Sequence, residues 1–197
     1  MNRPNTTLIF ATGNAHKVSE ISNAVPNWIE VKSMGECGFT EEIVESGTTL
    51  SENAKIKADA IHQHFEENCF ADDTGLMVDA LNGAPGVFSA RYAGEGCSFQ
   101  DNVSKLLREM KGKKNRSAHF STIISLWWNG RNIEFEGRVN GTITLSPKGS
   151  DGFGYDPIFQ PEGYSRTFSE MSLDEKNRIS HRAIAVRKLI EFLQNQQ

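Results

Sequence analysis

A short apolar run that ends in a tight turn, and is followed by an amphipathic segment, constrains this fold most. Residues 7–11 form the run, residues 12–14 contain the turn, and apolar residues recur at helical spacing over residues 18–25. This change of periodicity is typical of a strand that leads directly into a helix. A strand, a turn and a helix are therefore expected in that order.

A second helix and a second strand precede two adjacent acids. Residues 49–52 have the pattern of a capping box, which predicts a helix that continues to Phe65. The apolar run of residues 69–71 predicts a short strand, and Asp72 and Asp73 follow it at once. We therefore expect both carboxylates at the carboxyl end of that strand.

Longer strand-like runs dominate the second half. Residues 119–128 and 132–145 are joined by the dipeptide Asn129-Gly130, a strong hairpin signal that predicts antiparallel strands. Helices are expected on either side of them, one through residues 103–110 and one over residues 180–193. This order of elements predicts a mixed α/β fold, with helices flanking one sheet.

Composition and charge limit the class of protein. The chain has 197 residues, 38% of them hydrophobic, which is enough for a single domain over residues 1–197. Its formal net charge of −4 argues against the basic face that nucleic-acid binding requires. Its three cysteines have no CxxC spacing, and no apolar run approaches the ~20 residues of a membrane span. We therefore expect a cytoplasmic protein that binds neither nucleic acid nor membranes.

The first turn is a candidate phosphate site. Backbone N–H groups at a helix start attract phosphate, and Lys17 would add a positive charge beside Thr12, Gly13 and Asn14. The second glycine and the ending of a Walker loop are missing, so an ordinary turn beside a surface lysine is the alternative.

The acids indicate a magnesium site. Asp72 and Asp73 supply carboxylates of the kind that Mg²⁺ takes together with substrate phosphates, and Glu45 is a plausible second ligand on a nearby loop. Lys57, one helical turn after Asn53, is suited to contact phosphate or to polarise the reacting water. An acidic solvated turn and an exposed helix lysine are the alternatives.

The segment of residues 152–157 has the composition of a nucleobase pocket. Phe153 and Tyr155 supply flat rings, and Asp156 supplies acceptors for the N–H groups of a base. A glycine-rich loop pinned by buried aromatic rings is the alternative. Further along, cations gather at the start of the last predicted helix, at Lys176, His181 and Arg182. Cations disfavour that end of a helix unless a ligand compensates them.

Taken together, these segments resemble the inosine triphosphate pyrophosphatase family, whose members hydrolyse ITP, dITP and XTP. The resemblance covers almost the whole chain, and its motifs appear in the family's order. They are Thr12-Gly13-Asn14 with Lys17, Glu45 with Gly47 and Thr49, and the segments of residues 52–58, 71–76, 83–92, 152–159 and 180–182.

The resemblance implies roles for individual residues. Asp73 corresponds to the acid that acts at the metal and as general base, Glu45 to a magnesium ligand, and Lys57 to a catalytic residue on the triphosphate. Thr74 stands beside the reacting phosphate, where the family commonly has serine, and keeps the hydroxyl group. The implied contacts with the triphosphate are at Thr12, Asn14, Lys17 and Lys57, and Gly13 and Asn53 are also expected to bind the substrate. The residues implied around the base are Phe153, Gly154, Tyr155, Asp156, Lys176, His181 and Arg182.

The resemblance also implies an architecture and a reaction. The architecture is an elongated mixed sheet with flanking helices and two lobes around a central nucleotide cleft, usually in a homodimer. The reaction is magnesium-dependent attack of water on the α-phosphorus, which yields the nucleoside monophosphate and pyrophosphate. Two alternatives are an enzyme that removes other nucleotides by the same chemistry, and a nucleotide sensor without turnover. A sensor is expected to lose Asp73, Glu45 or Lys57, and all three are present.

Overall fold

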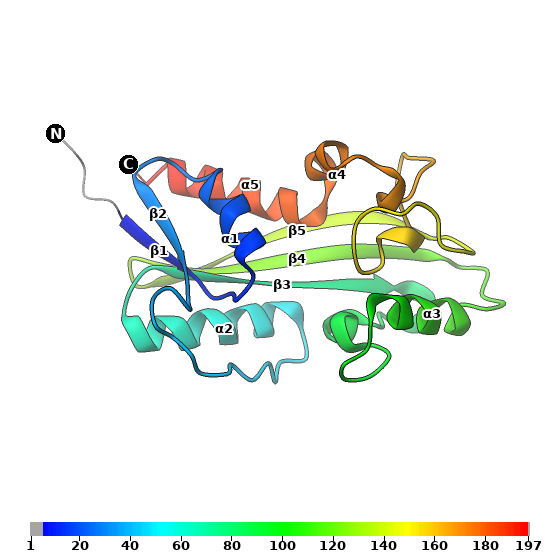
Figure 1. Ribbon diagram of the computed structural model, residues 1–197, viewed down its shortest axis with the longest axis horizontal. Coiled ribbons are helices and arrows are strands. Elements are labelled where there is room, and N and C mark those ends of the chain that lie inside the picture. The colour runs from blue at the N-terminus through cyan, green and yellow to red at the C-terminus, as the bar shows by residue number, and fades with distance from the viewer. Residues whose placement is uncertain (1–5, 197) are drawn as a thin grey trace. The chain divides into compact units, whose positions relative to one another are not determined.

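The computed structural model describes residues 6–196 and contains a mixed six-stranded sheet with flanking helices (Figure 1). The strand order is β2-β1-β3-β4-β5-β6. The strands are β1 (Thr6–Phe10), β2 (Ile29–Ser33), β3 (Cys69–Val78), β4 (Ser117–Trp128), β5 (Arg131–Ile143) and β6 (Phe159–Pro161). The helices are α1 (Ala15–Ser22), α2 (Leu50–Phe65), α3 (Phe99–Glu109), α4 (Leu173–Ile179) and α5 (His181–Gln194). The predicted fold class is therefore confirmed.

The sheet is parallel at one end and antiparallel at the other. β1 pairs in parallel with β2 and with β3, whereas β5 pairs in antiparallel fashion with β6. The predicted hairpin joins β4 to β5, and its turn residues Asn129 and Gly130 have φ values of 48° and 75°. Positive φ at both positions is what the favoured two-residue hairpin turn requires. The short strand β6 has no counterpart among the predicted elements.

By their internal contacts the residues form two compact units. Unit 1 contains the described residues up to Asp73, the segment Ile123–Glu136 and the described residues from Ala185 onward. Unit 2 contains Thr74–Thr122 and Gly137–Ile184. The resemblance predicts two lobes, and the chain has two units.

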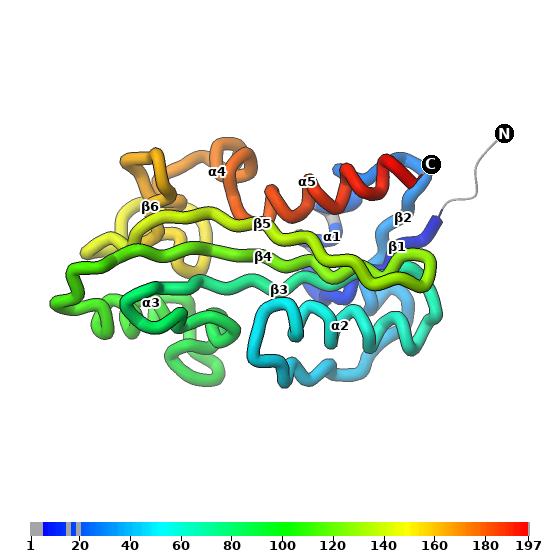
Figure 2. Tube along the Cα trace, turned by 180° about the vertical axis from the view of Figure 1, so that it is seen from behind, coloured from blue at the N-terminus to red at the C-terminus, as the bar shows by residue number. Residues whose placement is uncertain are grey.

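The core of unit 1 has two parts because side chains alternate along β1. Leu8 and Phe10 belong to a buried cluster with Leu189 of α5, whereas Ile9 belongs to a second cluster with Ile61 of α2. Figures 1 and 2 show α2 and α5 on opposite sides of these strands. Each helix therefore covers one row of the alternating apolar residues.

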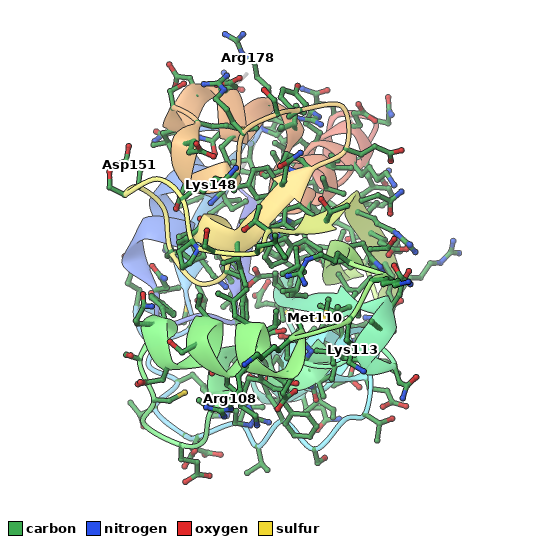
Figure 3. All side chains as sticks on the ribbon, turned by 90° about the vertical axis from the view of Figure 1, so that its right-hand side faces the viewer. Arg108, Met110, Lys113, Lys148, Asp151 and Arg178 are labelled. Carbon is green, nitrogen blue, oxygen red and sulfur yellow. The ribbon has the colours of Figure 1, made fainter. Side chains whose placement is uncertain are left out.

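Unit 2 has one buried cluster of its own. It joins Met110, directly after α3, to Phe159 of β6 and to Phe168. At its surface, Asp151 lies on an exposed loop and Arg178 points away from α4 (Figure 3). Among the described residues of the whole chain, no helix is long and apolar enough to cross a membrane.

The expectation that the adjacent acids end a strand is wrong. Aspartate and glycine are poor strand residues, which made the strand look short. In the structure, β3 continues through Asp72 and Asp73 to Val78, and it has β4 as its neighbour on the side away from β1. β1 pairs with β3 only as far as Phe10 and Phe70. The acids therefore follow the end of the parallel pair while remaining inside a strand.

Gly141 of β5 occupies a place in the sheet that leaves no room for a side chain. A Cβ atom there would collide with the carbonyl oxygen of Gln160 and lie 2.7 Å from Phe159 Cζ. We expect Gly141→Ala to lower the free energy of unfolding by about 1–3 kcal/mol, as overpacking does, measured by urea denaturation. The control is Gly35→Ala, because nothing lies within 4 Å of that position. Equal losses in the two variants would contradict the steric explanation.

Candidate active site

The turn after β1 is organised by Asn14. Its backbone N–H donates to the Thr12 hydroxyl oxygen at 3.2 Å, and its side-chain oxygen accepts the backbone N–H of Lys17 at 3.4 Å. Its carbonyl oxygen accepts the N–H of Val18 at 3.3 Å, which starts the hydrogen bonding of α1. Gly13 is exposed, with open space where a Cβ would stand. The predicted turn therefore presents its backbone at a helix start, where anions bind most readily.

Lys17 forms an ion pair with the first of the two acids. Its Nζ atom lies 2.8 Å from Asp72 Oδ1 and 3.0 Å from Oδ2, and the Asp72 side chain is only 6% exposed. Sequence reasoning placed Asp72 with the metal and did not find this pair. The strand's alternation is the signal that separates Asp72 from Asp73, because adjacent residues of a strand point to opposite faces.

Lys57 of α2 lies between two carboxylates. Its Nζ atom is 3.3 Å from Glu45 Oε1 and 3.7 Å from Asp73 Oδ1. Asp73 and Lys57 are mostly buried, with side chains 15% and 14% exposed. The three residues that the sequence predicted for catalysis and metal binding therefore meet in unit 1.

The pair of Glu45 and Asp73 fits a magnesium ion that is shared with a substrate. Among the side chains that the structure describes, no group of three or more His, Cys, Asp or Glu is arranged to hold a metal ion. Mg²⁺ usually takes one or two carboxylates and completes its shell with phosphate oxygens and water. Two carboxylates that approach one ammonium group can also approach a divalent cation, so the donor set is suitable.

The loop that carries Glu45 is fastened to α2 through Asn53. Asn53 is 1% exposed, and its side-chain oxygen accepts the backbone N–H of Gly47 at 2.8 Å. A Cβ on Gly47 would lie 2.6 Å from that oxygen, so only glycine permits the contact. Asn53 therefore supports the Glu45 loop, and its predicted contact with substrate stays a prediction.

The predicted capping box closes the same loop. The Glu52 carboxylate accepts the backbone N–H of Thr48 at 2.6 Å and that of Thr49 at 3.1 Å, while the Thr49 hydroxyl accepts the N–H of Glu52. The hydrogen bonds from Thr48, and then those from Thr49, hold the pKa of Glu52 below its ordinary value. The stability that these hydrogen bonds contribute is therefore fully present above the pKa that Glu52 has in the unfolded chain. It is lost as the pH falls through the lower pKa of Glu52 in the folded chain.

Thr74, the first residue of unit 2, is held from the neighbouring strand. Its hydroxyl oxygen lies 2.8 Å from the hydroxyl oxygen of Thr122 on β4. A hydroxyl on either residue donates or accepts, so the pair fixes the orientation of the Thr74 side chain.

The predicted base segment of unit 2 is organised by Asp156. Its Oδ2 atom accepts the backbone N–H of Phe153 at 2.9 Å and a hydrogen bond from Lys176 Nζ at 2.5 Å. Gly152 has a φ of 82°, and a Cβ there would collide with the same carboxylate oxygen. The buried carboxylate thus holds the loop from inside, and Gly154, with a φ of 62°, permits its second bend.

The two aromatic residues of this segment have different environments. Phe153 is 58% exposed, whereas Tyr155 is 4% exposed and belongs to the core of unit 2. Lys176 Nζ lies 4.6 Å from the centroid of the Phe153 ring, within the range of a cation–π contact. Only Phe153 of the two therefore offers an open ring face.

The predicted cluster of cations belongs to two helices. Lys176 lies on α4, and α5 begins at His181, so the expectation that Lys176 stands at the start of the last helix is wrong. Ser180 separates the two helices and caps the second, because its hydroxyl accepts the N–H of Ala183 at 3.2 Å. Serine at this position favours a helix start, and the sequence analysis expected the last helix to begin there. The helix that carries Lys176, α4, has no counterpart among the predicted elements.

His181 and Arg182 are the first two residues of α5 and belong to unit 2. His181 is buried and stacks on the ring of Phe120, with centroids 4.6 Å apart and an interplanar angle of 14°. Arg182 is half-buried beside it in the chain. No pattern in the sequence identifies Phe120 as the support of His181, since the two residues are far apart along the chain.

Comparison with known protein families identifies one that matches this chain. A model described as the Ham1 family matches residues 8–192. The chain belongs to the Ham1 family. The resemblance found in the sequence is therefore confirmed over almost the full length.

Relatives of this Ham1 chain share nearly half of its residues. A "dITP/XTP pyrophosphatase" of Flavobacterium psychrophilum is 49% identical over 188 residues, which cover 95% of this chain and 99% of that protein. A protein of the same name from Bacillus subtilis is 46% identical, with 94% and 96% covered. The solved structure of the Staphylococcus aureus Ham1 protein matches with a TM-score of 0.94 at 35% identity, covering 98% of this chain and 100% of that one.

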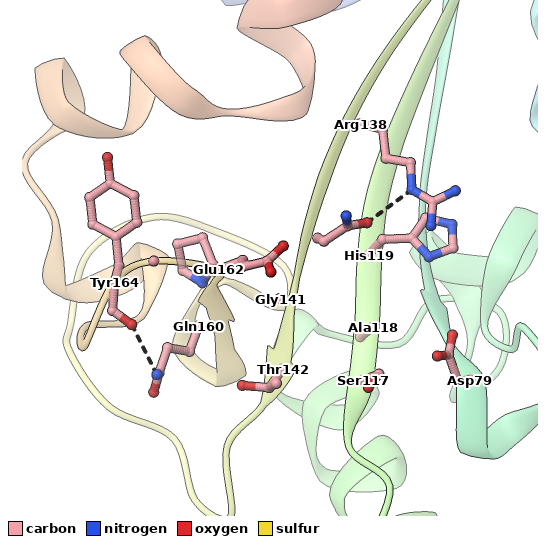
Figure 4. A pocket seen from close by; sticks show the side chains of 13 residues that line it. Asp79, Ser117, Ala118, His119, Arg138, Gly141, Thr142, Gln160, Glu162 and Tyr164 are labelled. Carbon is pink, nitrogen blue, oxygen red and sulfur yellow. Dashed lines mark hydrogen bonds between the residues drawn. The ribbon is translucent and has the colours of Figure 1, made fainter.

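The Ham1 chain also has a cavity of about 450 Å³ in unit 2 that contains none of the predicted site residues (Figure 4). Arg138 and Asn140 of β5 line it, and Arg138 Nε donates to Asn140 Oδ1 at 3.0 Å. On β6, the lining residue Gln160 follows the buried Phe159. The cavity therefore belongs to the polar face of the sheet and not to the candidate site.

Asn53→Ala is expected to loosen the Glu45 loop. The change leaves the N–H of the half-buried Gly47 without its acceptor. The cost is at most that of a fully buried group, about 1–3 kcal/mol, because water can partly replace the lost acceptor. Hydrogen exchange at the Gly47 amide should become faster by more than the global loss of stability explains. Asn102→Ala is the matched control, because Asn102 is also 1% exposed and its oxygen accepts the backbone N–H of Ala93 at 2.7 Å. Unchanged relative exchange at Gly47 in Asn53→Ala would contradict the fastening role.

Proposed function

We propose that this Ham1 chain hydrolyses non-standard purine nucleoside triphosphates, such as ITP, dITP and XTP, to the monophosphate and pyrophosphate. The observation that carries the proposal is the meeting of Glu45, Lys57 and Asp73 in unit 1. These are the residues for which the resemblance predicts metal binding and catalysis. The names of the relatives, dITP/XTP pyrophosphatase, supply the class of substrate.

The phosphate chemistry is assigned to the residues of unit 1. Glu45 and Asp73 would hold Mg²⁺, which neutralises phosphate charge and activates water when it is bound. Asp73 accepts the proton of the water that attacks the α-phosphorus, and pyrophosphate leaves as one group. Lys57 and Lys17 offset the negative charge that develops on the leaving phosphates.

Base recognition is assigned to the residues of unit 2. Phe153 offers the ring face for stacking, and the carboxylate of Asp156 keeps the Lys176 ammonium group beside it. A 6-oxo purine presents an acceptor where adenine presents an amino group, so a donor from Lys176 or Arg182 favours the 6-oxo bases. Guanine shares the 6-oxo group, and its rejection must depend on its 2-amino group.

The setting of the enzyme is inferred from the sequence. We infer a cytoplasmic homodimer in which residues 1–197 act as one functional domain. We infer further that the protein binds its nucleotide substrate but neither nucleic acid nor membranes. The cysteine pattern, the acidic charge balance and the resemblance support this setting. Each part stays a prediction.

The cleavage position and the metal requirement are tested together. We expect magnesium-dependent release of pyrophosphate from ITP, XTP and dITP, in preference to GTP and ATP. Chelation by EDTA should abolish the release, and added Mg²⁺ should restore it. The measurement is separate detection of pyrophosphate and orthophosphate for each nucleotide. Release of orthophosphate would contradict the mechanism, and turnover of other nucleotides alone would favour a different substrate.

Asp73→Asn tests the assigned general base. The amide keeps the shape of the side chain but cannot accept the proton, so kcat is expected to fall about 10³-fold or more. Asp79→Asn is the matched control, because Asp79 is an exposed acid that follows the same strand. Steady-state release of pyrophosphate from ITP measures both variants. Near-normal turnover by Asp73→Asn would remove Asp73 from the mechanism.

A further inference from the structure

The hydroxyl group of Ser89 connects two parts of the backbone in unit 2. Ser89 lies on a short 3-10 helix, η2 (Gly86–Arg91). Its Oγ atom accepts the backbone N–H of Leu76 on β3 at 2.9 Å and donates to the carbonyl oxygen of Gly86 at 2.6 Å. Leu76 stands two residues after Thr74, so this hydroxyl fixes η2 against the strand that carries Thr74.

The carbonyl oxygen of the same residue receives the hydroxyl of Tyr155. The distance from Tyr155 Oη to Ser89 O is 3.0 Å. Burial is the main cause that raises the pKa of Tyr155 above its ordinary value, so its hydroxyl stays protonated and donates throughout the neutral range. Tyr155 stands between Gly154 and Asp156 of the base segment. One serine thus contacts both β3 and that segment.

The helix η2 is itself held firmly by α3. Asn102 is buried, its oxygen accepts the N–H of Ala93 at 2.7 Å, and its amide donates to the carbonyl oxygen of Ala90 at 3.1 Å. Lys105 Nζ donates to the carbonyl oxygen of Tyr92 at 2.6 Å. The first of the residues held by these hydrogen bonds, Ala90, directly follows Ser89. The carbonyl group of Ser89 therefore has a fixed position, at which it accepts the hydroxyl of Tyr155.

We propose that Ser89 is a positioning residue for recognition of the base. It acts through Tyr155, holding the loop of residues 152–156 at a set position relative to Thr74 on β3. The inference rests on the proposed function, and it adds to that function a residue that touches neither the base nor the phosphates.

A positioning role predicts a particular kinetic change. Discrimination between purines depends on how closely donors meet the 6-position, and displacement of a loop weakens that match for the correct base most. Loss of the Ser89 hydroxyl removes the acceptor of the Leu76 N–H, so the strand that carries Thr74 is no longer fixed against η2 and the loop that Tyr155 ties to it. The change therefore raises KM for ITP and lowers the preference for ITP over ATP, with a smaller effect on kcat.

The experiment compares Ser89→Ala, Tyr155→Phe and the double variant, using kcat and KM for ITP and ATP with magnesium. Each single change is expected to raise KM for ITP about fivefold to tenfold, as the loss of one hydrogen bond does. Because both changes break the same connection, the double variant should be little worse than either single one. Ser89→Thr keeps a hydroxyl and should restore most of the preference for ITP.

Ser125→Ala provides the matched control. Ser125 is a fully buried serine of unit 1 whose hydroxyl accepts a hydrogen bond from Asn132 at 2.9 Å, so its loss lowers stability without touching the base segment. The ratio of kcat/KM for ITP to that for ATP should be unchanged in this variant, with all variants assayed below their thermal transitions.

An unchanged ratio in Ser89→Ala, or multiplied effects in the double variant, would overturn the inference about Ser89 and leave the proposed function standing. No turnover of ITP by the unaltered chain would overturn the proposed function and this inference with it.

Discussion

The alternation of side chains along β3 assigns two adjacent carboxylates to two different lysines, and the candidate phosphate site depends on this assignment. Asp72 pairs with Lys17 of α1, and Asp73 lies beside Lys57 of α2. Two neighbouring carboxylates on one face would repel each other and compete for the same cation. On opposite faces, the buried Asp72 pairs with Lys17, while Asp73 and Glu45 both lie near Lys57.

Side chains also alternate along β1, and this alternation determines the positions of the helices that carry the two lysines. Rows of apolar residues on β1 bury one side against α5 and the other against α2, so helices must cover both faces of the strands. Lys57 faces the acids because the apolar stripe of α2, which includes Ala54, Ala58 and Ile61, docks that helix in a fixed orientation. The chemistry of the site is therefore a consequence of how the core is filled.

Local signals in the sequence predicted the elements that depend on nearby residues. The capping box at Thr49 and the turn at Asn129-Gly130 are examples, because each is decided within a few residues. The sequence did not predict β6, the continuation of β3 through Asp72, or the helix α4 that carries Lys176. Strand pairing depends on partners far along the chain, and Tyr155 looked like a base-stacking ring because no local pattern reveals that its hydroxyl reaches Ser89.

The two candidate loops are preorganised by the same device. In each, a glycine leaves space for a buried side-chain oxygen, which then accepts a backbone N–H of the loop. Gly47 leaves space for Asn53 and donates to it, while Gly152 leaves space for Asp156, which accepts the N–H of Phe153. A loop bonded from inside loses little conformational entropy when a ligand arrives, so more of the contact energy is available for binding. Both loops are therefore ordered before any ligand binds, and neither has to fold around one.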